Sequence, residues 1–485
     1  MTRTTTARRP PARRAARSPA EAPYLTRAER VARGRALRAE VPRAAHAEFT
    51  PGAGRADPLE LLASQDTARL PELLPIRYGR MAVSPFTFYR GAALPMASDL
   101  VDTPRTGLLV QACGDAHCAN FGMFASPERR LMFDANDFDE TLPGPWEWDV
   151  KRLAASLEIA ARDNGYPGRA RREIVLAAVA GYRTAMRDFA ADTSLDVWYA
   201  AADIDSVRSR FKHVIRGSRA ERFAKSIDKA KTKDNLGTLA RFAGVTDDGA
   251  RIVAEPPLIV PVSELTESRS DPAAVMDGLR EVLAAYRTSL EPERRVLLDR
   301  YRLVDVARKV VGVGSVGTRS WMLLMLGEDV TDPLFLQAKE AGPSVLERFL
   351  GPSEYPNAGQ RVVVGQRMMQ AVSDIFLGWV RVHGFDGRTR DFYVRQLRDW
   401  KGSADLARMV PKAMRAYGEL CGWTLARAHA RTGDRLAIAA YLGSGTAFDV
   451  AVREFAVAYA DQTERDHAAL VDAIAGGRVT ARADL

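Results

Sequence analysis

Cysteine, long apolar runs and excess charge are all scarce in this 485-residue sequence. The three cysteines, Cys113, Cys118 and Cys421, fit neither a disulfide framework nor a zinc-binding spacing. No apolar run approaches the roughly 20 residues that span a bilayer. The arginine-rich start is not followed by the apolar segment of a secretory signal. We therefore expect a cytoplasmic protein with no membrane partner.

Acidic residues are absent from residues 1–20, which hold six arginines. These arginines contribute +6 to the net charge of +9, so the remaining residues carry only 9 − 6 = +3. This pattern predicts a disordered basic tail over residues 1–22 and a nearly neutral folded body. Nucleic acid is therefore not an expected partner. A second basic stretch, residues 209–235, is typical of a solvated helix face, but it also suits the mouth of a phosphate site.

The most informative stretch runs from Cys113 to Thr141 and contains three oxygen-bearing side chains in sequence. Asp115 follows a glycine, Asn120 comes next on the same short loop, and Asp137 follows at the end of RRLMFDAND. The segments NFGMF and RRLMFDAND are typical of two strands joined by the turn SPE. Such a hairpin would return Asp137 to the neighbourhood of Asp115.

An aspartate, an asparagine and a second aspartate in this order form the catalytic and metal-binding set of kinase-like phosphotransferases. We expect Asp115 to be the catalytic base for an attacking hydroxyl group. Asn120, Asp137 and Asp139 are the expected ligands of Mg²⁺, which would hold the phosphates of ATP. Asp115 or Asn120 alone would equally suit an ordinary turn. The complete set favours the catalytic interpretation.

A second motif, G-x-G-x-x-G, is formed by Gly312, Gly314 and Gly317. In a dinucleotide-binding fold a helix follows this motif, and an acidic residue about 20 positions further on binds the ribose. Asp332 nearly satisfies that distance. In a kinase, strands flank the motif and a lysine arrives on the next strand. The apolar run after the motif is too short for the packing helix of a dinucleotide fold, so the kinase context is favoured.

The kinase context assigns roles to Lys339 and to the glycine loop. Backbone N–H groups of Gly312, Gly314 and Gly317 would cover the nucleotide phosphates, and Lys339 would neutralise the phosphate charge as part of the catalytic set. We expect Glu347 to pair with Lys339 and complete the nucleotide site, because Glu340 would point to the opposite face of its strand. Without the glycine loop, Lys339 would be interpreted as an exposed lysine at a strand end.

The order of the motifs is the reverse of that in an ordinary kinase, in which the glycine loop precedes the catalytic loop. We therefore predict an α+β, two-lobed, protein-kinase-like fold that is circularly permuted, with a mostly helical large lobe and an antiparallel-sheet small lobe. Its expected parts are a helical lobe over residues 23–302, a strand-rich nucleotide lobe over 303–402 and a helical segment over 403–485. Residues 74–93 are expected to be irregular.

Several stretches resemble the bacterial family named domain of unknown function 2252, among them RMAVSPFTFYRGAA, GDAHCANFG, FDANDFDETLPGPWEWDVKRLAASL and YADQTERDH. The GDxHxxN and DFD motifs of that family are similar to those of aminoglycoside-phosphotransferase-like kinases. This similarity implies Asp115 as the base, Asn120 and Asp137 on the metal, and Asp149 as a support of the catalytic loop. Cys113 stands where a histidine often precedes Gly-Asp, so the support of the loop must differ.

Two assignments stay open at this point. Asp134 competes with Asp137 for the metal, although Phe138 beside Asp137 favours the latter as an orienting aromatic residue. Arg90 in FYRG suits either recognition of a phosphate or carboxylate, or a buried ion pair.

The expected function is ATP- and Mg²⁺-dependent transfer of a phosphoryl group to a hydroxyl of a small molecule of unknown identity. A kinase-fold adenylyltransferase is an alternative, because the same ions can serve a nucleotide bound the other way round. A non-catalytic nucleotide-binding module is a further alternative, although nothing obliges such a module to keep a base.

Overall fold

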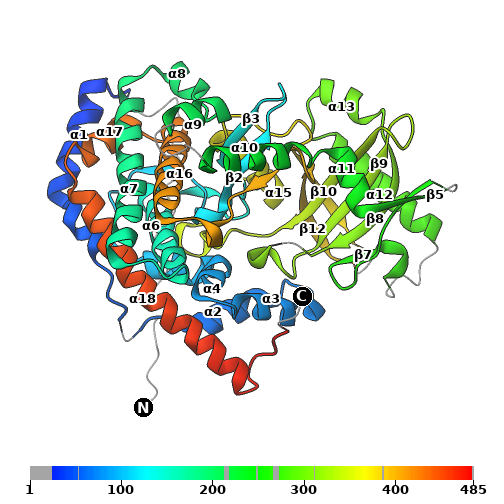
Figure 1. Ribbon diagram of the computed structural model, residues 1–485, viewed down its shortest axis with the longest axis horizontal. Coiled ribbons are helices and arrows are strands. Elements are labelled where there is room, and N and C mark those ends of the chain that lie inside the picture. Colours follow the sequence, from blue (N-terminus) through cyan, green and yellow to red (C-terminus); the bar gives the residue numbers. More distant parts are fainter. Residues whose placement is uncertain are drawn as a thin grey trace, which may run out of the picture.

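The computed structural model describes residues 24–52, 54–211, 218–246, 249–265, 272–310, 312–384 and 387–482. The predicted tail over residues 1–22 and part of the basic stretch 209–235 lie outside these ranges. The fold mixes helices with antiparallel sheets, so the predicted α+β class is confirmed. Figure 1 shows most of the long helices on one side of the molecule and the largest sheet on the other.

The helices in the first 300 residues are α1 (Arg27–Glu40), α2 (Pro58–Asp66), α3 (Leu74–Met81), α4 (Pro85–Gly91), α5 (Ala93–Leu100), α6 (Trp146–Asp163), α7 (Gly168–Ala191), α8 (Ser194–Tyr199), α9 (Ile204–Arg210), α10 (Ser218–Lys231), α11 (Asn235–Phe242), α12 (Pro272–Arg287) and α13 (Pro292–Leu298). The later helices are α14 (Glu347–Leu350), α15 (Ala358–Met369), α16 (Pro411–Thr432), α17 (Arg435–Leu442) and α18 (Ala447–Ala475).

The helical core is built around α6, which packs against α7, α16 and α18. The helices α7 and α16 pack closely against each other. A Cβ placed on Gly422 of α16 would lie 2.1 Å from the backbone oxygen of Ala178 on α7. The apolar stripe that the spacing of α18 predicts is buried as expected. Each of its members is at most 3% exposed: Phe448, Val452, Phe455 and Tyr459.

The largest sheet contains six antiparallel strands in the order β11-β12-β10-β9-β8-β7. Their bounds are β7 (Ile259–Pro261), β8 (Arg302–Lys309), β9 (Ser320–Leu326), β10 (Pro333–Ala341), β11 (Gly378–His383) and β12 (Thr389–Gln396). Five of these strands, β8 to β12, lie in the part of the chain, about residues 303–402, that is predicted to be rich in strands. The edge strand β7 was not predicted, because three residues give no measurable alternation.

A small sheet lies between the helices and the large sheet (Figure 1). It consists of β13 (Gly402–Ser403), β2 (Phe121–Ala125) and β3 (Leu131–Ala135), in that order. The hairpin predicted from NFGMF and RRLMFDAND is thereby confirmed. Two further antiparallel pairs are β1 (Leu109–Ala112) with β4 (Leu142–Pro145), and β5 (Ala243–Thr246) with β6 (Gly249–Ile252).

The expectation of an irregular segment over residues 74–93 is wrong, because most of this segment forms α3 and α4. Pro85 occupies the first turn of α4, where its missing N–H is not needed. The side chains of Ser84 and Thr87 form a capping box at the same end. The aromatic residues that made this segment look irregular point into the core, since Phe88 and Tyr89 are both 1% exposed.

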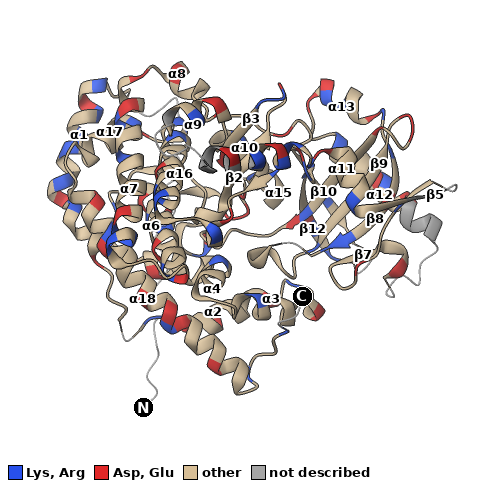
Figure 2. Cartoon of the chain, viewed as in Figure 1, with Lys and Arg blue, Asp and Glu red and all other residues tan. Residues whose placement is uncertain are grey.

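Charged residues of both signs occur on the helices and on the sheet (Figure 2). This distribution agrees with the nearly neutral body expected from the sequence. Among the described helices, none is long and apolar enough to cross a membrane.

Candidate active site

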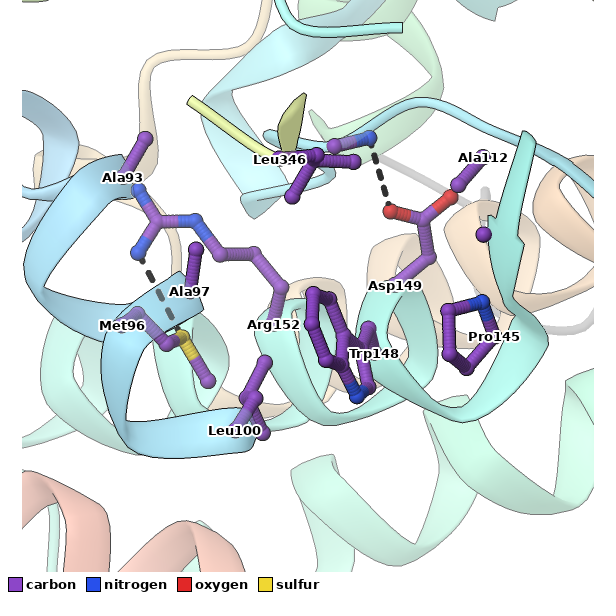
Figure 3. A pocket seen from close by; sticks show the side chains of 12 residues that line it. Ala93, Met96, Ala97, Leu100, Ala112, Pro145, Trp148, Asp149, Arg152 and Leu346 are labelled. Atoms are coloured by element: carbon purple, nitrogen blue, oxygen red, sulfur yellow. Dashed lines mark hydrogen bonds between the residues drawn. The ribbon is translucent and has the colours of Figure 1, made fainter. Parts of the chain in front are cut away.

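The loop that carries Asp115 is built around Gly114, which has a φ of +79°. A Cβ at this position would lie 2.3 Å from the backbone oxygen of Glu140, so a larger residue would displace the segment that follows Asp137. The loop is held from below by Asp149 on α6, whose carboxylate accepts hydrogen bonds from the backbone N–H groups of Cys113 (2.6 Å) and Gly114 (2.9 Å). Figure 3 shows the carboxylate of Asp149 with one of these hydrogen bonds as a dashed line. Asp149 therefore holds the Asp115 loop from the helix that follows the hairpin.

Asp149 is itself fixed by His429 of α16, whose Nε2 lies 3.1 Å from its carboxylate. The other ring nitrogen of His429 is 2.9 Å from the hydroxyl of Tyr182 on α7. All three side chains are buried. Cys113 stands where a histidine often precedes Gly-Asp. In this protein the loop is supported through His429 of α16, which lies more than 300 residues later in the chain.

A small cavity of about 10 Å³ lies behind the loop, where apolar residues of α5, including Met96 and Leu100, face Trp148. Arg152 crosses this cavity and contacts the sulfur of Met96 at 3.5 Å. A space of this size holds about one water molecule and no ligand.

Asp115 is oriented by Arg152, which lies on α6 one turn after Asp149. Arg152 donates to Oδ1 of Asp115 from Nε (2.8 Å) and approaches it with Nη2 at 2.6 Å. The guanidinium is fixed in turn by the backbone oxygen of Tyr89 and by the face of its ring. His117 Nε2 lies 3.9 Å from Oδ2 of Asp115. Since Oδ1 is occupied, Oδ2 is the oxygen that can accept a proton.

His117 is buried and stays neutral. Burial, followed by the charges of Arg152 and Arg90, holds the pKa of His117 well below its ordinary value. A neutral imidazole beside Asp115 adds no charge that would compete with Arg152 for the carboxylate.

Asn120 closes the same loop, because its Nδ2 donates to the backbone oxygen of Asp115 at 2.8 Å. Its own backbone oxygen accepts from Asn136, next to Asp137, at 2.8 Å. The hairpin thus returns Asp137 to this loop, as the strand pattern predicts. No described residue donates to Oδ1 of Asn120, which leaves that oxygen for a ligand.

Lys339 meets Asp139 across the boundary between the large sheet and the loops that carry Asp115 and Asp137. Its ammonium forms an ion pair with Oδ2 of Asp139. The two residues are 200 positions apart in the sequence. Tyr393, directly opposite Lys339 on β12, donates to Oδ1 of Asp139 at 2.8 Å. Lys339 is only 3% exposed, so it is not a solvated lysine at a strand end.

The expected pair between Lys339 and Glu347 is wrong. Glu347 accepts hydrogen bonds from the backbone N–H groups of Ser344 (2.9 Å) and Ser353 (3.1 Å), and its carboxylate lies 3.7 Å from Arg361. It therefore stabilises the turn after β10. Asp139 is the partner of Lys339 instead, because the hairpin that positions Asp137 also brings Asp139 within reach of β10. The expectation for Glu340 is consistent with the structure, since Glu340 pairs with Arg319 and Arg390.

Asp137 and Asp139 lie in contrasting electrostatic surroundings. Burial and the charge of Asp139 raise the pKa of Asp137. For Asp139 burial opposes ionisation, but the charge of Lys339 and hydrogen bonds from Lys339 and Tyr393 lower its pKa. Asp139 is thus already neutralised by a protein cation, whereas Asp137 is a half-buried carboxylate with only partial compensation. A bound cation would serve Asp137 first.

Asp134 is excluded from the metal role by its own ion pair. Both of its carboxylate oxygens lie 2.7 Å from Nη2 of Arg427 on α16. It also accepts from the backbone N–H of Ala371 at 3.0 Å. The preference for Asp137 over Asp134 therefore has a structural basis.

Gly312, Gly314 and Gly317 form a tight turn around the 3₁₀ segment Val313–Ser315. Its carbonyl groups are held by Arg69, which donates to the oxygens of Val316 and Gly314. Ser315 Oγ lies 3.4 Å from Asp139, so the loop reaches the carboxylates. The strand β9 follows the motif where a dinucleotide fold needs a helix, so the dinucleotide interpretation and its Asp332 are wrong.

The sequence model of a family described as an uncharacterized protein conserved in bacteria (DUF2252) matches residues 69–473. The chain belongs to this family. The match includes all residues of the site from Asp115 to Tyr393. No curated protein and no solved structure matches the DUF2252 chain.

Within the described residues, no group of three or more His, Cys, Asp and Glu side chains is arranged to hold a metal ion. The carboxylates therefore do not form a complete metal cage. Asp137 and the Oδ1 of Asn120 offer oxygen atoms of the kind that would bind Mg²⁺ if phosphate oxygens and water supplied the other ligands. Asp139, assigned as a third ligand, instead pairs with Lys339.

Four residues of the DUF2252 site escaped the sequence analysis: Arg152, Tyr393, Arg395 and Lys401. Arg152 could have been found from the sequence, because it follows Asp149 by three positions and therefore lies on the same helix face. Arg395 donates to the backbone oxygen of Asn136 at 3.0 Å. Burial and the charge of Arg395, opposed by Asp137, lower the pKa of Lys401 to about 7. Only the register of β10 with β12 and the path of the chain after β12 reveal these three.

Proposed function

We propose that this protein is an ATP- and Mg²⁺-dependent phosphotransferase that acts on a hydroxyl group of a small molecule. The observation that carries the proposal is the ion pair of Lys339 with Asp139. This ion pair joins β10, which carries Lys339, to the segment that carries Asp137 and Asp139. The glycine loop and the Asp115 loop lie next to the same segment. These are the parts that kinases use to bind and transfer a phosphoryl group.

The order of the strands supports the same proposal. The glycine loop joins β8 to β9, Lys339 lies on the adjacent strand β10, and α15 follows before β11 and β12. Kinases place the glycine loop, the lysine strand and the next helix in this succession. One departure is that α15 contains no acidic residue to pair with the lysine. In this protein Asp139 provides that charge.

The connection between the two parts supports a circular permutation. The chain leaves the large sheet through β12 and enters α16, whose His429 supports the catalytic loop. The catalytic loop itself comes about 300 residues earlier in the chain than α16. A two-lobed, kinase-like arrangement with displaced termini accounts for this order.

In the proposed reaction, Asp115 accepts the proton of the attacking hydroxyl on its free Oδ2. Arg152 holds the carboxylate in place through its contacts with Oδ1. Lys339 and the N–H groups of the glycine loop offset the charge of the phosphates. Mg²⁺, held by Asp137 and Asn120, would add further charge neutralisation when bound.

Nucleotide binding is the first test, and it needs no acceptor. ATP with Mg²⁺ should raise the unfolding temperature of the wild-type protein. Asp115→Asn should retain this rise but lose ATP turnover, whereas the exposed Asp472→Asn should retain both. Mass spectrometry of the protein after incubation with ATP separates phosphorylation from adenylylation. Absence of any nucleotide effect on the wild type would refute the proposal.

A further inference from the structure

Arg90 lies at the end of α4, between the glycine loop and the catalytic loop. Its guanidinium is beside the first glycine, since a Cβ placed on Gly312 would lie 4.0 Å from Nη2. Its backbone is beside the second glycine, since a Cβ placed on Gly314 would lie 3.2 Å from its oxygen. Arg90 therefore packs against the glycine loop, next to the place where the outer phosphates of a nucleotide would lie.

The catalytic loop is on the other side of Arg90. The residue before Arg90, Tyr89, accepts a hydrogen bond on its backbone oxygen from Arg152 at 2.9 Å. The same guanidinium donates to Oδ1 of Asp115 at 2.8 Å. One arginine therefore links the backbone next to Arg90 to the loop that carries Asp115.

Neighbouring arginines have anionic or carbonyl partners that occupy them. Arg152 binds Asp115, Arg77 binds Asp66, and Arg69 binds the oxygens of Val316 and Gly314. Arg90 differs, because no carboxylate among the described residues pairs with it and its buried Nε donates no hydrogen bond. The buried Nδ1 of His117 also lacks a partner.

Arg90 thus does not form the buried ion pair that the FYRG sequence allowed. The other interpretation of Arg90, recognition of a phosphate or carboxylate, is therefore favoured. A half-buried guanidinium without an anion is costly unless a ligand completes it. Arginine suits a phosphoryl group because its planar fork can contact two oxygens at once.

We propose that Arg90 binds the terminal phosphoryl group of the nucleotide, between the glycine loop and Asp115. This proposal rests on the proposed function. During transfer the acceptor oxygen bonds to phosphorus, the bond to the diphosphate breaks with its electron pair on the leaving oxygen, and the hydroxyl proton goes to Asp115. Arg90 offsets the charge on the phosphoryl oxygens throughout, a role that other phosphotransferases give to an arginine finger.

The test compares ATP with ADP, because only ATP carries the group that Arg90 would bind. Calorimetric titration with each nucleotide and Mg²⁺ uses the wild type, Arg90→Gln, Arg90→Lys and the exposed control Arg105→Gln. Arg90→Gln should weaken ATP about 10- to 100-fold and ADP less than about threefold. Arg90→Lys should show a smaller loss for ATP alone, and it serves as the informative variant if the glutamine variant does not fold. Arg105→Gln should bind both like the wild type.

Two results overturn the inference in distinguishable ways. If Arg90→Gln changes ATP and ADP equally, or changes neither, Arg90 does not bind the terminal group and the proposed function is unaffected. If the wild type binds neither nucleotide, the proposed function and the role of Arg90 are both wrong.

Discussion

At the scale of single residues, the centre of the site is a carboxylate shared between a lysine and a tyrosine. Tyr393→Phe removes one hydrogen bond to Asp139 and leaves the ion pair with Lys339. We expect ATP turnover to fall about two- to tenfold, because one such bond contributes about 0.5–1.5 kcal/mol. The exposed Tyr199→Phe is the control. A loss as large as that of Lys339→Met would contradict a purely orienting role.

Asp134 and Arg427 form a second pair whose purpose can be separated from metal binding. Either single change, Asp134→Asn or Arg427→Gln, leaves a buried charge without its partner and should cost about 3–5 kcal/mol of stability. The double variant should recover part of that loss, because no isolated charge remains. Denaturant unfolding measures all four proteins. A double variant as unstable as the sum of the singles would show that the pair is not coupled.

At the scale of secondary-structure elements, the contact of α7 with α16 depends on small residues. Gly422→Ala should destabilise the protein by about 1–3 kcal/mol, because its Cβ would meet the backbone of Ala178 rather than a flexible side chain. Gly168→Ala at the exposed start of α7 has no close neighbour and should be neutral or slightly stabilising. Thermal unfolding distinguishes the two variants, and equal effects would show that the helices can separate without cost.

Elements with a long apolar period were predictable from the sequence. The strands β8 to β12 and the stripe of α18 follow from alternation and from the 3.6-residue period. The helices α3 and α4 were not predicted, because their aromatic residues and Pro85 mask the period of two short helices. The three-residue β7 carries no pattern at all.

Within the site, the hairpin that brings the loops of Asp115 and Asp137 together was predictable, and the cationic partners of the aspartates were not. Asp115, Asn120 and Asp137 stand in a spacing with chemical meaning, and the hairpin that joins them is local. The partner of Lys339 was mistaken, because a nearby acid in sequence was preferred to a distant one in space. His429 acts through a contact between α16 and α6, which composition does not encode.

At the scale of the whole molecule, a buried lysine makes stability depend on pH. Lys151 is 0% exposed, its ammonium lacks a hydrogen-bond partner, and it lies 4.6 Å from the ring centre of Phe455. Burial, partly offset by Glu147 and Glu48, lowers its pKa from 10.5 to about 7. Between these two values the unfolded chain binds more protons, so the free energy of unfolding should rise with pH.

Lys151→Met should remove the contribution of Lys151 to this dependence, which amounts to at most about 1.4 kcal/mol per pH unit. The contribution of Lys401, whose pKa is also lowered to about 7, should remain. Denaturant unfolding at pH values of about 7.5 and about 9.5 measures the slope. The exposed Lys412→Met is the control and should keep the slope of the wild type. An unchanged slope in Lys151→Met would mean that the lysine ionises alike in both states.

The 200-position separation between Asp139 and Lys339 also has a consequence for biosynthesis. At about 5–20 residues per second, a ribosome needs roughly 10–40 s to extend a nascent chain over that interval. During this time the emerging aspartates lack their lysine, and the hairpin must stay solvated or be shielded by other factors. Ribosomes stalled before β10 should therefore carry a protease-sensitive segment around Asp139, and stalling after β12 should protect it.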